Sequence, residues 1–298
     1  MYRSFFHLQT NPFAGNPDPR FLYMMPHTRE ALATLEYGIS AHKGFIVLTG
    51  EVGTGKTTLL RRALGSLDQS RVFSSFIFNP RLDVLDFLEF ILSDFGIPCQ
   101  NRTKSGMLIQ LHRWLIERFR HEETCVIVVD EAQNLDWELL EEIRLLTNLE
   151  TSTEKLVQIV LSGQPELEEK LHAPNVRQLR QRIALWARTY AITGEQTAAY
   201  IAQRLLVAGT SDRIFLDEAV AAIHRASRGI PRIINLICEH ALILAYVEQV
   251  HQVPARLIQA IAGDLDLDPQ PFVVSATHGG FSTSSTLPSE KLTGREER

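Results

Sequence analysis

Apolar residues along the chain alternate between short continuous runs and longer stretches with helical spacing. Continuous runs at Phe45–Thr49, 72–78 and Thr124–Val129 predict buried strands, since a strand covered on both faces has no solvent-facing positions. We expect two further strands over 156–161 and 184–192. Helical spacing predicts helices over the intervening segments, at 28–40, 58–64, 84–95, 105–120 and 137–149. Strands that alternate with helices predict an α/β fold with a parallel five-stranded sheet covered on both faces.

Both ends of the chain depart from this alternation. Residues 1–27 are rich in Pro, Phe and Asn and predict an N-terminal strap, since prolines exclude a long helix there. Beyond residue 193 only helical patterns remain, at 195–208, 217–227, 231–248 and 254–262, with Asp217 as a cap and Pro231 in a first turn. We therefore expect a core over 28–192, a small helical lid domain over 193–262 and a disordered polar tail over 263–298.

A glycine-rich loop separates the first apolar run from the next helical segment. The loop follows the spacing G-x-x-x-x-G-K-T, which predicts a phosphate-cradling loop in a strand–loop–helix context. Its residues are Gly50, Glu51, Val52, Gly53, Thr54, Gly55, Lys56, Thr57 and Thr58. Glycines let backbone N–H groups face phosphate oxygens, Lys56 reaches the β and γ phosphates, and the Thr57 hydroxyl suits Mg²⁺. A chance glycine-rich turn does not explain the flanking strand and helix. The sequence therefore predicts a nucleoside triphosphate and Mg²⁺ as ligands.

Composition narrows the class of protein. The 298 residues are 45% hydrophobic and carry a net charge of −5, which argues against a uniformly basic nucleic-acid binder. Three scattered cysteines predict reduced thiols, and no histidine spacing predicts structural zinc. The N-terminus does not resemble a signal peptide, and no apolar run approaches the ~18 residues that span a bilayer. We expect a soluble cytoplasmic protein.

Two adjacent acids end the third apolar run. The carboxyl ends of parallel strands are where ligands bind in such sheets. We expect Asp130 to orient Mg²⁺ and Glu131 to polarise the water that attacks the γ-phosphate. The alternative is that both acids only cap the next helix. At the end of the fourth strand, Gln164 or Ser162 is expected to reach the γ-phosphate or this water, with Gln164 favoured for its length; a polar loop beside Pro165 is the alternative.

Two further segments supply arginines. Arg182, or otherwise Arg180, precedes the fifth strand without acids nearby in sequence, and we expect it to contact the γ-phosphate in a neighbouring subunit. A solvated basic face is the alternative. Arg232 begins a lid helix and is expected to lie over the phosphates when the lid closes; the alternative is a helix-surface arginine.

These motifs, in this order, resemble the AAA+ ATPases and more narrowly the general secretion pathway protein A (ExeA-type) family. The resemblance covers about residues 1–262 and includes Asn11-Pro12-Phe13, the phosphate loop, Asp130-Glu131-Ala132-Gln133, Gly163-Gln164-Pro165 and Gly229 to Asn235. It implies a RecA-like P-loop sheet with a helical lid, Mg-dependent ATP hydrolysis, and a homo-oligomer, dimer or ring, with the site at subunit boundaries. It also implies membrane-associated partners in secretin, type IV pilus-like or exopolysaccharide export assembly.

The chain departs from the longer family members after the ATPase region, and a second class of protein shares the same ATPase module. Longer family members carry a transmembrane helix and a peptidoglycan-binding domain where this chain has a polar tail, so we expect a short form, cytoplasmic or peripheral at the inner membrane. Transposition regulators of the TnsC/TniB type share the ATPase module and are ATP-gated DNA binders. The Asn-Pro-Phe segment within the strap favours the secretion family over the transposition regulators. Nucleic acid is therefore the less favoured partner.

Overall fold

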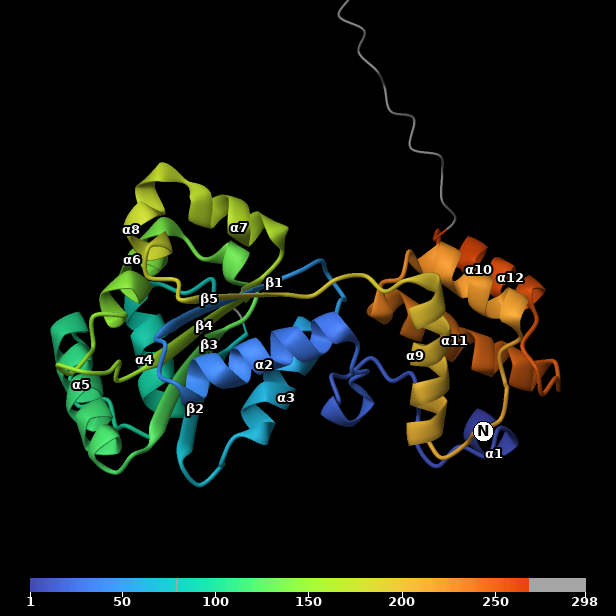
Figure 1. Ribbon diagram of the computed structural model, residues 1–298, viewed down its shortest axis with the longest axis horizontal. Helices are drawn as coiled ribbons and strands as arrows, with labels where there is room; N and C mark the ends of the chain where they lie inside the picture. The colour runs from blue at the N-terminus through green and yellow to red at the C-terminus, as the bar shows by residue number, and fades with distance from the viewer. Residues whose placement is uncertain (79, 268–298) are drawn as a thin grey trace, which may run out of the picture. The chain divides into compact units, whose positions relative to one another are not determined.

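The apolar runs form one parallel sheet in the order β2-β3-β4-β1-β5 (Figure 1). The computed structural model describes residues 1–78 and 80–267. The strands are β1 Phe45–Thr49, β2 Val72–Ile77, β3 Thr124–Val129, β4 Gln158–Gly163 and β5 Leu185–Arg188. Because β4 separates β1 from β3, the polar residues that end β4 lie between the phosphate loop and the acids after β3.

Helices cover both faces of this sheet. The side chains of Ile46 and Leu48 pack on one face with α2 Pro26–Ser40 and α3 Lys56–Ser66. Those of Phe45 and Val47 pack on the other face, within a larger apolar cluster. That cluster involves α4 Val84–Asp94, α5 Lys104–Arg120, α6 Trp137–Leu146, α7 Pro165–His172 and α8 Arg177–Arg180. The alternation of β1 side chains between two cores is the period-two pattern of a strand buried on both faces.

Several elements differ from expectation, most clearly β4, β5, α7 and α8. Strand β4 begins two residues later, because residues 149–156 first close a turn through the bond from Leu156 N to Leu149 O. Strand β5 has four residues, since it pairs only with β1 and that strand ends at Thr49, opposite Arg188. Helices α7 and α8 were not predicted; Pro165 occupies the first turn of α7, where its missing N–H costs nothing.

Four helices follow the sheet. They are α9 Gly194–Val207, α10 Asp217–Ser227, α11 Pro231–Val247 and α12 Ala255–Asp264. Pro231 lies in the first turn of α11, as expected. The prediction that Asp217 caps α10 is wrong: the N-cap is Leu216, and the Asp217 carboxylate pairs with Arg213 instead. Most of the predicted tail, residues 268–298, lies outside the described residues.

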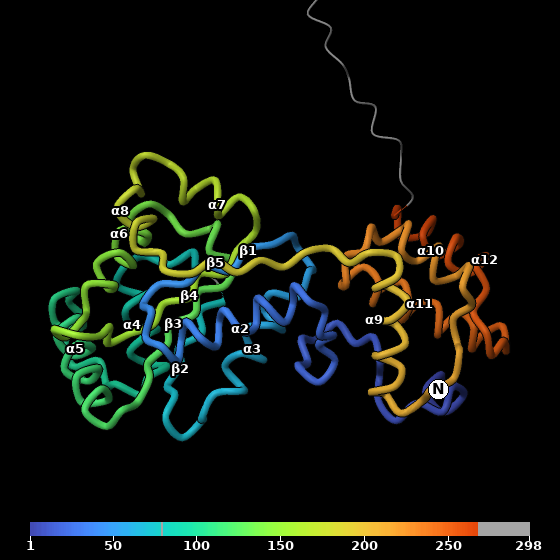
Figure 2. The backbone as a smooth tube through the Cα atoms, in the orientation of Figure 1, coloured from blue at the N-terminus to red at the C-terminus, as the bar shows by residue number. Residues whose placement is uncertain are grey.

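The N-terminal segment packs with these four helices (Figure 2). It contains two short helical turns, α1 Tyr2–Phe5 and η1 Pro19–Phe21. Phe6, Phe13 and Phe21 are buried in the same apolar cluster as α9 to α12. The buried Arg204 guanidinium lies 6.0 Å from the Phe13 ring centroid and 4.7 Å from that of Phe21. Cation–π contacts of this kind fix the aromatic side chains in place.

None of the helices in the described part of the chain combines the length and the apolar character needed to cross a bilayer.

Candidate active site

The glycine-rich loop connects β1 to α3, and its backbone takes conformations that favour glycine. Gly53 has φ +80° and Gly55 has φ +98°, both in the left-handed region. A Cβ atom added to Gly55 meets nothing within 4 Å, so the loop borders open space there. Lys56 opens α3, which puts the free N–H groups of the first helical turn beside this space. The loop thus presents backbone N–H donors to open space, which is the arrangement that binds phosphate groups.

The Lys56 ammonium lies over the loop itself. Its Nζ donates to the carbonyl oxygens of Gly50, at 2.7 Å, and Glu51, at 3.1 Å. Burial lowers the pKa of Lys56, while the carboxylates of Glu131 and Asp130 oppose this shift. The Lys56 ammonium is therefore a buried cation that faces two carboxylates. Buried charges need partners of opposite sign, which a phosphate group bound together with a metal cation would supply.

Three side chains form a chain of hydrogen bonds beside this lysine. The Thr57 hydroxyl donates to Asp130 Oδ2 at 2.6 Å, and the buried Ser162 hydroxyl donates to Asp130 Oδ1 at 2.8 Å. Among the described residues, no group of three or more His, Cys, Asp or Glu side chains is arranged to hold a metal. One carboxylate beside one hydroxyl is instead the sparse oxygen set that suits Mg²⁺, which binds with waters and phosphates. Thr57 and Asp130 fit that ion.

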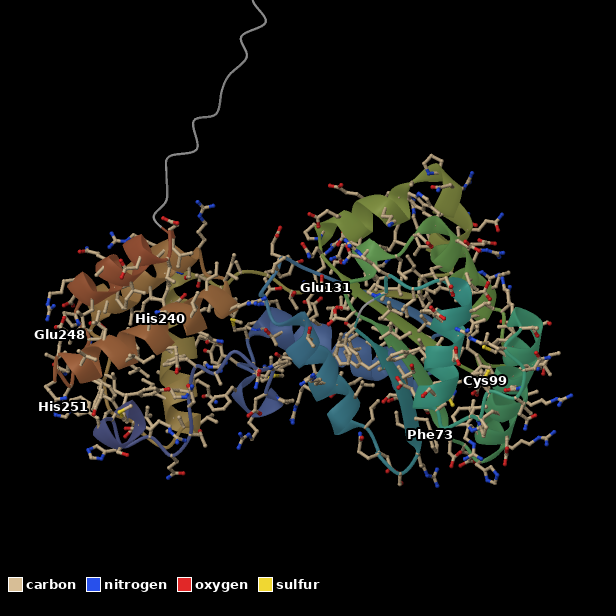
Figure 3. All side chains as sticks on the ribbon, turned by 180° about the vertical axis from the view of Figure 1, so that it is seen from behind. Phe73, Cys99, Glu131, His240, Glu248 and His251 are labelled. Atoms are coloured by element: carbon tan, nitrogen blue, oxygen red, sulfur yellow. The ribbon has the colours of Figure 1, made fainter. Side chains whose placement is uncertain are left out.

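Glu131 follows Asp130 with φ +54°, so the chain turns sharply as it leaves β3. Its Oε2 accepts hydrogen bonds from Gln133 Nε2 at 2.7 Å and from Gln164 Nε2 at 3.2 Å. Figure 3 labels Glu131 among the side chains of the sheet region. Gln164 therefore lies against the proposed base, whereas Ser162 contacts Asp130 and Asn134 is exposed.

The lid contacts the loop through Arg232. The backbone N–H of Arg232 donates to the Gly53 carbonyl oxygen at 3.1 Å. A Cβ on Gly53 would lie 2.7 Å from Arg232 Cβ, so only glycine allows this approach. The loop also contacts the end of β5, since the Thr54 and Thr189 hydroxyls are 2.7 Å apart. In the rest of the loop, Val52 is exposed and Thr58 is half-buried.

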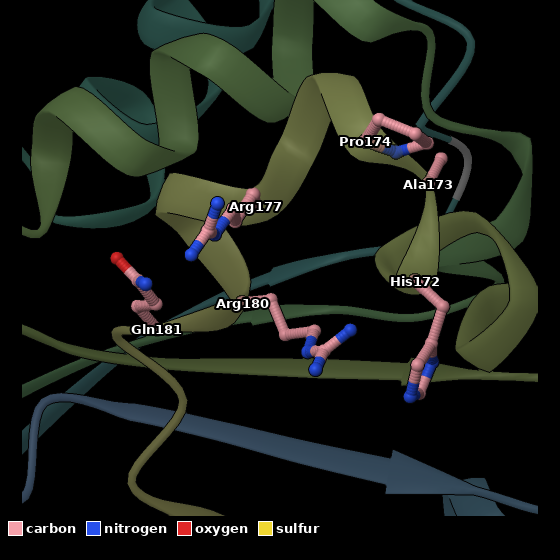
Figure 4. Close-up of a pocket in the computed structure, with 6 residues that line it drawn as sticks. All are labelled: His172, Ala173, Pro174, Arg177, Arg180 and Gln181. Atoms are coloured by element: carbon pink, nitrogen blue, oxygen red, sulfur yellow. The ribbon is translucent and has the colours of Figure 1, made fainter.

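Arg182 and Arg180 lie away from this cluster. They precede β5, which runs parallel to β1, so their backbone lies at the end of the sheet where these strands begin, whereas the loop follows Thr49 at the end where β1 finishes. Arg182 interacts electrostatically with Glu150. Arg180 lines a hollow of about 240 Å³ with His172, Ala173, Pro174, Arg177 and Gln181 (Figure 4). Neither arginine belongs to the loop cluster of its own chain.

Two further residues lie at the site, although the sequence predicts no role for them. Gln133 contacts Glu131, and Glu168 on α7 accepts hydrogen bonds from the Thr49 hydroxyl and, at 2.9 and 3.0 Å, from Arg188. The Arg188 guanidinium holds the pKa of the Glu168 carboxyl below its ordinary value. Reading Pro165 as the first residue of a helix was the available signal, since it places Glu168 one turn further along the helix.

The chain is similar in sequence to a known domain family and to a known protein. An AAA domain family model matches residues 39–171. General secretion pathway protein A of Aeromonas hydrophila is 42% identical over 268 residues, which are 90% of this chain and 48% of that protein. This chain thus spans about half the length of that relative.

Solved structures share the fold at low identity. The Aeropyrum pernix ORC2 protein in ADPNP-ADP complexes is 14% identical with a TM-score of 0.62, covering 86% of this chain and 72% of that chain. Pyrobaculum aerophilum Cdc6p is 18% identical with a TM-score of 0.65, covering 81% and 67%. The Thermotoga maritima RuvB Holliday junction branch migration motor is 17% identical with a TM-score of 0.54, covering 80% and 70%. Together with the Aeromonas relative and the AAA domain match, the parallel sheet and its phosphate loop show that the chain belongs to the AAA+ ATPases, in the family of general secretion pathway protein A.

Proposed function

We propose that this chain binds ATP with Mg²⁺ at residues 50–58 and hydrolyses it to ADP and phosphate, in support of a secretion, type IV pilus-like or exopolysaccharide export system. The proposal is carried by one observation: beyond the carboxyl ends of β1 and β3, four residues come together, Lys56, Thr57, Asp130 and Glu131. Cation, metal ligands and base are the groups that phosphoryl transfer requires.

Each residue has a distinct role in this proposal. Backbone N–H groups of the loop and Lys56 hold the phosphates, and Thr57 with Asp130 holds the metal, which when bound offsets the phosphate charge. Glu131 accepts the proton of the attacking water, and Gln164, which contacts Glu131, reaches this water or the γ-phosphate. Arg232 lies over the phosphates from the lid. Arg182, or otherwise Arg180, reaches the γ-phosphate of a neighbouring copy, because neither lies near its own loop.

The test of hydrolysis is the Glu131→Gln variant. It keeps the shape of the side chain and the metal ligand Asp130 but cannot accept a proton. ATP binding is expected to persist while phosphate release falls at least ~100-fold. Glu138→Gln, on the exposed first turn of α6, is the matched control and is expected to turn over normally. Normal turnover by Glu131→Gln would place the base elsewhere.

The export role rests on the Aeromonas relative and on the division of the chain. We propose an N-terminal strap over 1–27, an ATPase core over 28–192 and a lid over 193–262, acting as a homo-oligomer at the cytoplasmic side of the inner membrane. In cells that carry only Glu131→Gln, assembly of the export machinery is expected to fail, as scored by surface pili or exported polymer. Normal export in these cells would contradict the role.

A DNA-binding transposition regulator is the competing function. Its support is a group of exposed arginines where α10 meets α11, at Arg225, Arg228 and Arg232. Arg232 already contacts the phosphate loop through its backbone, and the chain is acidic overall. We therefore expect weak, nucleotide-independent duplex binding at about 150 mM salt. Tight ATP-dependent binding by wild type and Glu131→Gln would favour the regulator.

A further inference from the structure

The side chain of Gln133 joins Glu131 to the end of β4. Gln133 lies in a short turn, η2 Ala132–Asn134, that follows Glu131 directly. Its Nε2 donates to Glu131 Oε2 at 2.7 Å, and its Oε1 accepts the backbone N–H of Gln164 at 3.2 Å. One amide group therefore makes two different hydrogen bonds, one to each of the elements that flank the site.

These two bonds allow a single orientation of the amide. Turning the group by 180° would place its oxygen against the Glu131 carboxylate and its NH₂ group against the Gln164 N–H. Space for the observed orientation depends on Gly163, where an added Cβ would lie 2.9 Å from Gln133 Oε1. The orientation of Gln133 is thus fixed from two sides, by the Glu131 carboxylate and by the backbone N–H of Gln164.

The backbone of Gln133 is anchored as well. Lys170 Nζ, on α7, donates to the Gln133 carbonyl oxygen at 3.1 Å and to that of Leu135. The same ammonium lies 5.1 Å from the Trp137 ring centroid. Helix α7 thereby fixes the turn from which the Gln133 side chain reaches back to Glu131.

We propose that Gln133 is a positioning residue that sets the direction of the Glu131 carboxylate. This inference rests on the proposed function, in which Glu131 accepts the proton of the attacking water. Gln133 does not touch the nucleotide in this scheme; it acts through Glu131. Gln164 donates to the same oxygen over a longer distance, 3.2 Å against 2.7 Å, so Gln133 makes the shorter bond to Glu131 Oε2.

The first test separates turnover from binding. Gln133→Leu keeps most of the side-chain volume and removes both hydrogen bonds. Loss of a residue that orients a functional group is expected to lower kcat about 10–100-fold, with ATP affinity unchanged. Gln133→Glu keeps an acceptor for the Gln164 N–H but sets a second carboxylate against Glu131, and is also expected to lower kcat. Asn134→Leu, exposed in the same turn, is the matched control and is expected to keep the wild-type rate.

The second test asks whether Gln133 acts through Glu131. In the double variant Glu131→Gln, Gln133→Leu, the residual rate is expected to equal that of Glu131→Gln alone, because residues acting as one unit are non-additive. A further drop in the double variant, or a Gln133→Leu variant at the wild-type rate, would overturn the role of Gln133. A wild-type protein without ATP turnover would instead overturn the proposed function itself.

Discussion

The Thr57 hydroxyl donates a hydrogen bond to Asp130 Oδ2 at 2.6 Å, across 73 residues of sequence. The Asp130 carboxylate also accepts a hydrogen bond from the Ser162 hydroxyl, and the backbone N–H of Asp130 donates to the Ile77 carbonyl oxygen. Its orientation is therefore set by the first turn of α3 together with strands β2 and β4. The Thr57 and Asp130 oxygens that we assign to one metal ion are therefore within hydrogen-bonding distance of each other.

Replacement of Thr57 by Val is expected to remove the effect of Mg²⁺ on ATP binding. The variant keeps the shape of the side chain and loses the hydroxyl that we assign to the metal. Calorimetric titration of ATP with and without Mg²⁺ is expected to give two different affinities for the wild type and one for Thr57→Val. Thr34→Val, on the surface of α2, is the control. A persistent Mg²⁺ effect in Thr57→Val would remove Thr57 from the metal site.

Lys56→Ala is expected to weaken nucleotide binding. A charge-assisted hydrogen bond to phosphate contributes roughly 1.5–3 kcal/mol, which corresponds to about 10–150-fold in affinity. Titration with a fluorescent nucleotide measures this loss. Lys43→Ala, an exposed lysine that lies over the Tyr37 ring, is the matched control. Unchanged affinity in Lys56→Ala would contradict the assignment of the loop.

Hydrolysis is expected to depend on assembly, because Arg182 precedes β5 and so lies at the opposite end of the parallel strands from its own loop. An arginine supplied by a neighbour raises turnover by ~10³–10⁵. Arg182→Ala and Glu131→Gln proteins are each expected to be inactive, while their mixture regains activity, since one boundary then has both groups. Arg180→Ala, measured in parallel, tests the second choice. Turnover that is independent of protein concentration, without rescue in the mixture, would indicate a monomeric enzyme.

Glu168 is expected to make stability depend on pH. The hydrogen bond from Arg188 lowers the pKa of this carboxyl from its ordinary value of 4.5. A carboxyl whose pKa is lower in the folded state stabilises the fold above that ordinary value, and the contribution disappears as the pH falls through the folded-state pKa. The difference in unfolding free energy between wild type and Glu168→Gln is therefore expected to be largest near pH 7 and to shrink below pH 4.5.

Urea unfolding at a series of pH values measures this difference. Glu169→Gln, the exposed neighbour on α7, is expected to change little at any pH. A Glu168→Gln difference that stays constant from pH 7 into acid would show that the Glu168 charge does not contribute.

Sequence patterns were most reliable where a strand is buried on both faces. The bounds of β1 and β3 follow directly from their apolar runs, because these strands are buried along almost their whole length. Strand β5 is shorter than its apolar pattern, since its length is limited by its partner β1. The cap at Asp217 failed because a nearby cation, Arg213, competes for the same carboxylate. The length of β5 and the cap of α10 both depend on contacts with neighbouring residues in the folded structure. A local sequence pattern carries no information on these contacts.

The same distinction applies to the candidate site. Lys56 and Thr57 follow from loop spacing, and Asp130 follows from the end of a buried strand. The contact of Gln133 with Glu131 depends on a non-glycine residue with positive φ, and the contact of Glu168 with Thr49 depends on how α7 packs. Neither backbone strain nor helix packing is visible in residue spacing.

The burial of Phe13 among helices near the other end of the chain has a consequence for synthesis. Arg204 Nε donates to the Pro12 carbonyl oxygen over a separation of 192 residues. At a translation rate of roughly 5–20 residues per second, the N-terminal aromatic residues wait about 10–40 s before this partner exists. During that time the core between them can fold, while the partners of Phe6, Phe13 and Phe21 on helices α9 to α12 are not yet made. The newly made chain is therefore vulnerable to aggregation and to chaperone capture at these aromatic residues until α9 to α12 follow.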